Sequence, residues 1–134
     1  MSLTGRRGLS GEEIVELSKR YTLYDWSAQS KIAPLPVDRA EGVYFWTTDG
    51  TRYLDFNSQL MGLIIGHGDK RVIDAVAKQG EKLPYITPVA AFETRALLGR
   101  KLASLWPGAL EKSFFTLGGA EANENAIRMA RMFT

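Results

Sequence analysis

The stretch that decides the fold reads KSFFTL-GGA-EANENAIRMAR, with Lys112–Leu117 followed by Gly118-Gly119-Ala120 and then by Glu121–Arg131. The first segment predicts a β-strand and the last a helix, as in an α/β fold. Glycines let the backbone turn sharply and approach a ligand closely. The helix N-terminus beyond them offers unpaired N–H groups and the positive end of a dipole. Gly118–Ala120 therefore predict a seat for an anion, most often a phosphate. The alternative is a turn that needs only a positive φ.

Composition limits the classes of function. The 134 residues carry a net charge of +2, which is too small to predict a nucleic-acid or membrane partner. The longest apolar run, Leu60–Ile65, is too short to cross a bilayer, and Met1–Ser10 lacks the apolar centre of a signal peptide. Zero cysteines exclude disulfides and thiolate catalysis, and a single histidine supplies a metal site poorly. We expect a cytoplasmic protein without a metal.

The first half of the chain predicts a helix, a long connection and a β-hairpin. Ser10 and Glu13 fit a capping box for a helix that ends near Tyr21. Residues 22–42 predict a connection, since prolines interrupt it. Residues 43–48 and 52–56 predict two strands joined by the turn-forming pair Asp49-Gly50.

The following residues predict a buried irregular segment and two helices before the decisive stretch. The irregular segment covers 57–68, which is rich in glycine around an apolar run. Asp69 is expected to cap a helix that continues to Leu83, and a second helix is expected over 91–106. Their apolar positions are expected to face inward. The last helix builds an apolar face up to Thr134 without a C-terminal capping signal, so we expect a piece cut inside a larger protein.

Three motifs, in order, resemble those of the class III aminotransferases, enzymes that use pyridoxal phosphate. Gly42–Phe56 looks like the opening hairpin of that family, and Ile65–Asp69 resembles its Gly-His-Gly turn before a helix. Phe114–Glu124 is similar to the motif on the phosphate side of the cofactor, usually Ser-Gly-Ser/Thr-Glu-Ala-Asn-Glu. The ordered set is far more specific than a glycine pair before a helix.

The resemblance implies an α/β fold, the N-terminal portion of a fold-type I transferase dependent on pyridoxal 5'-phosphate. Residues 1–66 would supply the N-terminal helix, loop and β-hairpin of the small domain, and 67–134 the truncated start of the large cofactor-binding domain. Family members act as homodimers. Their reaction moves an amino group from an amine or ω-amino acid to a keto acid such as pyruvate.

The resemblance also implies site residues. Gly118, Gly119 and Ala120 would bind the cofactor phosphate. The substrate pocket would be lined by Trp26, Leu60, Met61 and Tyr85. The alternative for these four is packing: plain core for Leu60 and Met61, and ordinary loop packing for the two aromatics.

Two departures from the family pattern matter. The lysine that forms the Schiff base in the family lies beyond residue 134, so no catalytic residue is expected here and the chain alone should be inactive. The hydroxyl position of the phosphate motif holds Ala120, and the lost hydrogen bond to a charged group is worth roughly 1.5–3 kcal/mol. The alternatives are a non-catalytic module that binds an anion or self-associates, or another pyridoxal-phosphate reaction such as that of an aminomutase or decarboxylase.

The charged residues near these motifs have structural interpretations. Glu121 and Glu124 would repel a phosphate, so we expect their side chains to turn away or to find partners. His67 is expected to be a structural hydrogen-bonding residue, Asp69 a helix cap and Asp49 a turn residue. For Asp55 two roles stay open, at the end of the hairpin or in an interface.

Overall fold

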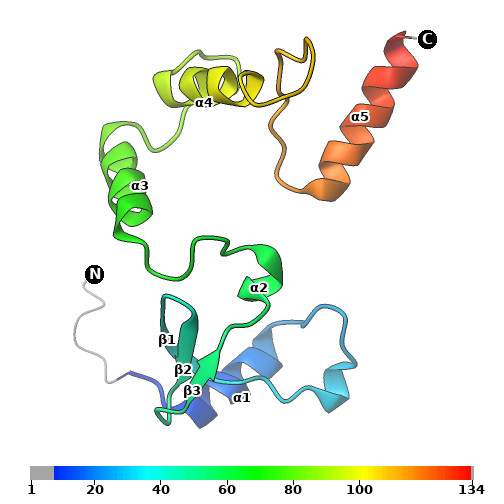
Figure 1. Ribbon diagram of the computed structural model, residues 1–134. Helices are drawn as coiled ribbons and strands as arrows, with labels where there is room; N and C mark the ends of the chain where they lie inside the picture. The colour runs from blue at the N-terminus through cyan, green and yellow to red at the C-terminus, as the bar shows by residue number, and fades with distance from the viewer. Residues whose placement is uncertain (1–7, 134) are drawn as a thin grey trace. The chain divides into compact units, whose positions relative to one another are not determined.

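The computed structural model describes residues 8–133, which divide between two compact units, Met1–Pro84 and Tyr85–Thr134 (Figure 1). Each unit is described by itself. Residues 1–7, where no signal peptide was expected, and Thr134 lie outside the described residues. The predicted domain division after residue 66 stays a prediction, because the units describe compactness within this chain alone.

The first unit opens with α1, Gly11–Tyr21, as the capping box predicts. The Ser10 side chain accepts from the Glu13 amide at 3.2 Å, and the Glu13 carboxylate accepts from the Ser10 amide at 2.7 Å. A Cβ on Gly11 would overlap Thr48 Oγ1 and lie 3.1 Å from Pro36 Cγ. The start of α1 therefore packs beside the sheet at a position that only glycine fits (Figure 1).

Three antiparallel strands form the sheet in the order β1-β2-β3, with β1 at Val37–Glu41, β2 at Tyr44–Thr47 and β3 at Arg52–Leu54. The hairpin of β2 and β3 is confirmed, with Gly50 at φ +85° in its turn. The prediction of a connection throughout 22–42 is wrong, since it also contains the 3₁₀ turn η1, Gln29–Lys31, and β1. Strand β1 lies at an edge of the sheet and carries three charged residues among its five. It therefore lacks the apolar alternation by which a strand is predicted from sequence.

Aromatic side chains hold the small sheet together. On one face the Tyr44 and Trp46 rings lie 6.3 Å apart, with the Arg39 guanidinium 3.8 Å from the Trp46 ring centre. Phe45 stacks on Tyr53 at 5.1 Å, from paired positions of β2 and β3. The Arg39–Trp46 and Phe45–Tyr53 pairs lie across neighbouring strands, and the Tyr44–Trp46 pair lies along β2.

The unit ends with a short turn and a helix. Element α2, Ser58–Met61, is one turn, and α3, Lys70–Lys82, begins after Asp69, whose carboxylate accepts from the Arg71 amide at 2.9 Å. The predicted cap is thus confirmed. The prediction that 57–68 is buried is wrong: its apolar side chains are half-buried or exposed, with Ile64 87% exposed.

The second unit holds α4, Glu93–Ala103, and α5, Gly119–Phe133. Helix α4 is shorter than the predicted 91–106. The predicted strand at 112–117 is absent, because among the described residues no strand pairs with it and an unpaired strand has no hydrogen-bond ladder.

Apolar side chains remain largely open to solvent. Among residues 8–133 no hydrophobic residue is buried, although Val72, Ile73, Val76 and Leu98 were expected to face inward. The exposed apolar side chains include Ile64 and Ile65 and, on the last helix, Ile127, Met132 and Phe133. In the part of the chain that the structure describes, helices are too short or too polar to cross a bilayer.

Candidate functional site

The predicted anion seat lies at the start of α5. The first helical bond across this boundary runs from the Ala122 amide to the Gly118 carbonyl at 3.0 Å, which makes Gly118 the N-cap. Within the described residues the amides of Gly118, Gly119 and Ala120 donate to no backbone or side-chain acceptor. Three N–H groups are therefore free at the positive end of a 15-residue helix.

Neither glycine is required by the local backbone. Gly118 and Gly119 are absent from the positive-φ glycines, and a Cβ on either would meet nothing within 4 Å. The interpretation of this pair as a turn that needs a positive φ is therefore wrong. What glycine adds here is open space beside free amides, the arrangement that fits an anion such as a phosphate.

The acidic residues of this helix have partners, as expected. The Glu121 carboxylate accepts from the Leu117 amide at 2.9 Å, and Glu124 pairs with Arg128 at 2.5 Å. The Glu121 contact occupies the amide just before the seat and leaves the next three open.

The side chains predicted to line a substrate do not pack in this chain. Trp26 is 91% exposed and has φ +52°, which is uncommon for a tryptophan. Leu60 and Met61 follow β3 in the first unit, and Tyr85 opens the second, where it is 78% exposed. The core interpretation fails for the described residues, and the substrate role stays a prediction.

A largely buried hydrogen bond joins Asp55 to His67, and sequence reasoning assigned it only in part. Asp55 Oδ2 lies 2.7 Å from His67 Nε2, and the Asp55 side chain is only 4% exposed. Burial raises the pKa of Asp55, but hydrogen bonds from His67 and Gln59 outweigh it and lower the pKa below its ordinary value. The structural role predicted for His67 is confirmed. The turn role of Asp49 is confirmed too, since its carboxylate accepts from the Thr51 amide at 3.0 Å.

Residues 58–61 carry a feature that the sequence did not indicate. Each of these four has a positive φ, although none is glycine. No residue type in the run favours the left-handed region, so composition offered no signal for it.

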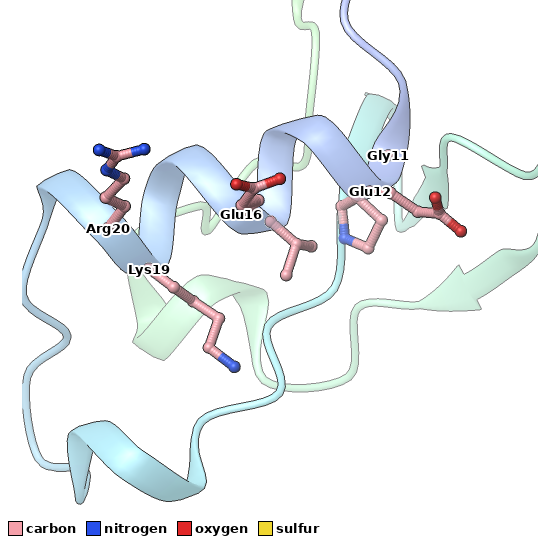
Figure 2. A pocket seen from close by; sticks show the side chains of 7 residues that line it. Gly11, Glu12, Glu16, Lys19 and Arg20 are labelled. Atoms are coloured by element: carbon pink, nitrogen blue, oxygen red, sulfur yellow. The ribbon is translucent and has the colours of Figure 1, made fainter.

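A separate hollow of about 620 Å³ lies along α1 and is lined by Gly11, Glu12, Val15, Glu16, Lys19, Arg20 and Pro36. Figure 2 shows the side chains of Glu12, Glu16, Lys19 and Arg20 along the helix. None of the predicted site residues lines the hollow. Two acidic and two basic side chains follow its helical wall, so its charge favours neither an anion nor a cation. Groups of three or more His, Asp or Glu side chains that could hold a metal are absent from residues 8–133.

The sequence of this chain is similar to those of known proteins. The sequence model of the family "Aminotransferase class-III" matches residues 26–134. A leucine/methionine racemase of Thermococcus litoralis is 32% identical over 124 residues, which are 92% of this chain and 28% of the racemase. An acetylornithine aminotransferase of Methanothermobacter thermautotrophicus is 29% identical over 94% of this chain and 31% of its own length. The chain thus spans about three tenths of these relatives.

Solved structures are similar as well. A taurine:2-oxoglutarate aminotransferase from Bifidobacterium kashiwanohense, in complex with PLP and glutamate, has a TM-score of 0.89 and 37% identity over 95% of this chain and 28% of its own. An (S)-enantioselective omega-transaminase from Thermomicrobium roseum has a TM-score of 0.89 and 32% identity over 95% of this chain and 30% of its own. These likenesses confirm the predicted α/β class and its assignment to fold type I.

Proposed function

The chain belongs to the class III aminotransferases, and from this premise we propose that it forms part of an enzyme that transfers an amino group. The donor is an amine or ω-amino acid, the acceptor is a keto acid such as pyruvate, and the cofactor is pyridoxal 5'-phosphate. The observation that carries the proposal is the set of free amides at Gly118, Gly119 and Ala120.

The residues at this helix start fit the phosphate of the cofactor. Three N–H groups can donate to its oxygens, and the dipole of α5 favours its negative charge. The missing side chains at Gly118 and Gly119 let the oxygens come close. Ala120 contributes its amide alone, without a hydroxyl. When bound, the cofactor supplies an electron sink, and this chain's residues hold and orient it.

Substrate contact would come from exposed apolar side chains. Trp26, Leu60, Met61 and Tyr85 are bulky and not packed against other described residues. In this role they would exclude water and shape the donor pocket.

The proposal assigns the chain no covalent chemistry of its own. None of its lysines matches the family motif of the Schiff-base lysine; they are Lys19, Lys31, Lys70, Lys78, Lys82, Lys101 and Lys112. The complete enzyme would supply that lysine, act as a homodimer in the cytoplasm, and divide its small and large domains after residue 66.

The test uses the complete transaminase that contains this chain. Purified enzyme is incubated with a panel of amines and ω-amino acids plus pyruvate, and alanine is measured. We expect alanine in proportion to donor consumed. The substitution Gly119→Val should weaken cofactor binding at least tenfold, because the valine side chain would then occupy the space proposed for the phosphate. Absence of alanine with every donor in the panel would refute transfer to pyruvate, and unchanged cofactor affinity in Gly119→Val would refute the seat.

A second candidate is racemisation of an amino acid, which the similarity to a leucine/methionine racemase favours. The two reactions differ in their need for an acceptor, because transamination requires a keto acid and racemisation does not. Inversion of a chiral amino acid without any keto acid indicates racemisation, whereas transamination stops when pyruvate is withheld.

A further inference from the structure

Residues 58–61 form a left-handed turn built without glycine. The φ angles of Ser58, Gln59, Leu60 and Met61 are 50°, 52°, 58° and 64°, and ψ is 57° at Gln59 and 44° at Leu60. In this region the Cβ of an L-residue crowds its own backbone, so single residues visit it and runs are rare. Such a backbone persists only where its surroundings hold it.

The Asp55 carboxylate is the side chain that holds this turn, beside main-chain bonds from the Met61 amide to the Asn57 carbonyl at 2.9 Å and from the Leu63 amide to the Ser58 carbonyl at 3.1 Å. One of its oxygens accepts from the Gln59 amide at 3.2 Å, inside the turn, and the other lies 2.7 Å from His67 Nε2. An ionised carboxylate only accepts hydrogen bonds, so His67 Nε2 carries the proton and donates it. The carboxylate therefore joins the left-handed turn to the Gly-His-Gly segment.

The sheet anchors both ends of this connection. The Asp55 amide donates to the Val43 carbonyl at 2.9 Å. His67 and Gly42 exchange two backbone hydrogen bonds, of 2.8 and 3.0 Å. Asp55 and His67 are thus fixed by main-chain bonds before their side chains meet. The side chains that contact the turn are therefore held by main-chain bonds to the sheet.

The strained backbone presents apolar side chains outward. Leu60 is 64% exposed and Met61 is 78% exposed, so packing within the described residues does not account for the conformation. A relaxed right-handed turn would point both side chains elsewhere. Strain that persists at exposed positions is a common mark of a functional segment.

We infer that Asp55 and His67 are positioning residues that hold the left-handed turn so that Leu60 and Met61 form a fixed wall for the amino donor. This inference rests on the proposed function. The pair does not touch substrate; it sets where the wall stands and thereby which donors fit.

The test compares Asp55→Asn with the double variant Asp55→Asn/Gln59→Gly in the complete transaminase. Glycine adopts the left-handed region without steric cost, so at position 59 it relieves one of the four strained residues. We expect Asp55→Asn to lower kcat/KM about tenfold for a bulky amine and far less for a small one, because Leu60 and Met61 are misplaced. Gln59→Gly should restore part of the loss. Asp49→Asn is the matched control, since Asp49 also accepts from a main-chain amide but lies in the hairpin turn.

A purely structural role predicts a different pattern. Equal losses for both amines, in proportion to the folded fraction, would overturn the inference, and so would failure of Gln59→Gly to rescue. His67→Gln, which keeps a donor, should preserve donor selectivity better than His67→Ala, and the reverse order would also count against it.

A second measurement separates this inference from the proposed reaction. Three-bond HN–Hα couplings of Gln59 and Leu60 report φ directly, with or without activity. Asp55→Asn should move them away from left-handed values, and Asp49→Asn should not. Unchanged couplings in Asp55→Asn would refute the positioning role even if amino transfer is confirmed. Changed couplings without amino transfer would refute only the proposed reaction.

Discussion

Gly66 offers the sharpest test of the structural reasoning, through the substitution Gly66→Ala. Gly66 has φ +85°, and an added Cβ would lie 2.9 Å from the Gly42 carbonyl oxygen and 3.3 Å from its carbon. That same oxygen accepts from the His67 amide at 2.8 Å. The clash therefore falls on backbone that cannot rotate away without breaking the bridge between Gly42 and His67.

The cost has two sources. A left-handed alanine costs about 1–2 kcal/mol. Crowding a fixed carbonyl adds about 1–3 kcal/mol, as overpacking does. Reduced entropy of the unfolded chain returns about 0.4–1 kcal/mol. The net loss for Gly66→Ala is thus about 1–4.5 kcal/mol.

Gly50→Ala is a matched control. Gly50 also has φ +85°, but a Cβ there would meet nothing within 4 Å. Its cost is the backbone term alone, about 1 kcal/mol. The difference between the two variants isolates the contact with Gly42.

The assay is equilibrium urea unfolding followed by tryptophan fluorescence, in which Trp46 reports on the sheet. Hydrogen exchange at the Gly42 and His67 amides measures the local opening. We expect Gly66→Ala to lower the unfolding free energy more than Gly50→Ala and to speed exchange at both amides. If the two variants are equally stable, the close approach of Gly66 to Gly42 is wrong.

Three further predictions follow from single residues. Ala120→Ser adds a hydroxyl beside the free amides, and a charge-assisted bond of about 1.5–3 kcal/mol should tighten pyridoxal phosphate binding by roughly 10- to 150-fold; titration against phosphate-free pyridoxal, whose affinity should not change, checks this. Gly80→Ala, at an interior position of α3 where a Cβ meets nothing within 4 Å, should stabilise the chain by about 0.5–1 kcal/mol in urea unfolding, and a loss of stability would contradict the open surround. The folded pKa of Asp55 is lowered, so the unfolded carboxyl binds protons more readily; its contribution is complete above an unfolded pKa of about 3.9 and is lost as pH falls through the folded value. Stability measured across this acid range should fall less steeply in Asp55→Asn, and identical profiles would show that Asp55 contributes nothing.

Local signals predicted the elements that local chemistry determines. Ser10 with Glu13, Asp69, and the Asp49-Gly50 turn each specify backbone within a few residues, and the structure has the expected cap or turn at each. Strand β1 was missed because its sequence is charged and its identity as a strand depends on pairing with β2. The segment 112–117 shows the converse: its sequence favours a strand, yet the described residues hold no partner for it.

The candidate site divides in the same way. The free amides of Gly118–Ala120 follow from a glycine pair before a helix, which the sequence displays. The left-handed turn donates its Gln59 amide to the Asp55 carboxylate, which also contacts His67, 12 residues further along, and no residue type in Ser58–Met61 indicates this conformation. Conformations enforced by a distant side chain leave no trace in the segment that adopts them.

Two kinds of glycine in this chain make the functional argument concrete. Gly11 and Gly66 are explained within the chain, because a Cβ would strike Thr48 or Gly42. Gly118 and Gly119 are not, since neither has a positive φ nor any neighbour within 4 Å of a built Cβ. Glycine is tolerated well at an N-cap such as Gly118, whereas Gly119 lies inside the helix and gives this chain no benefit in packing or turn geometry. That space fits the proposed cofactor phosphate, which would accept hydrogen bonds from the free amides beside it.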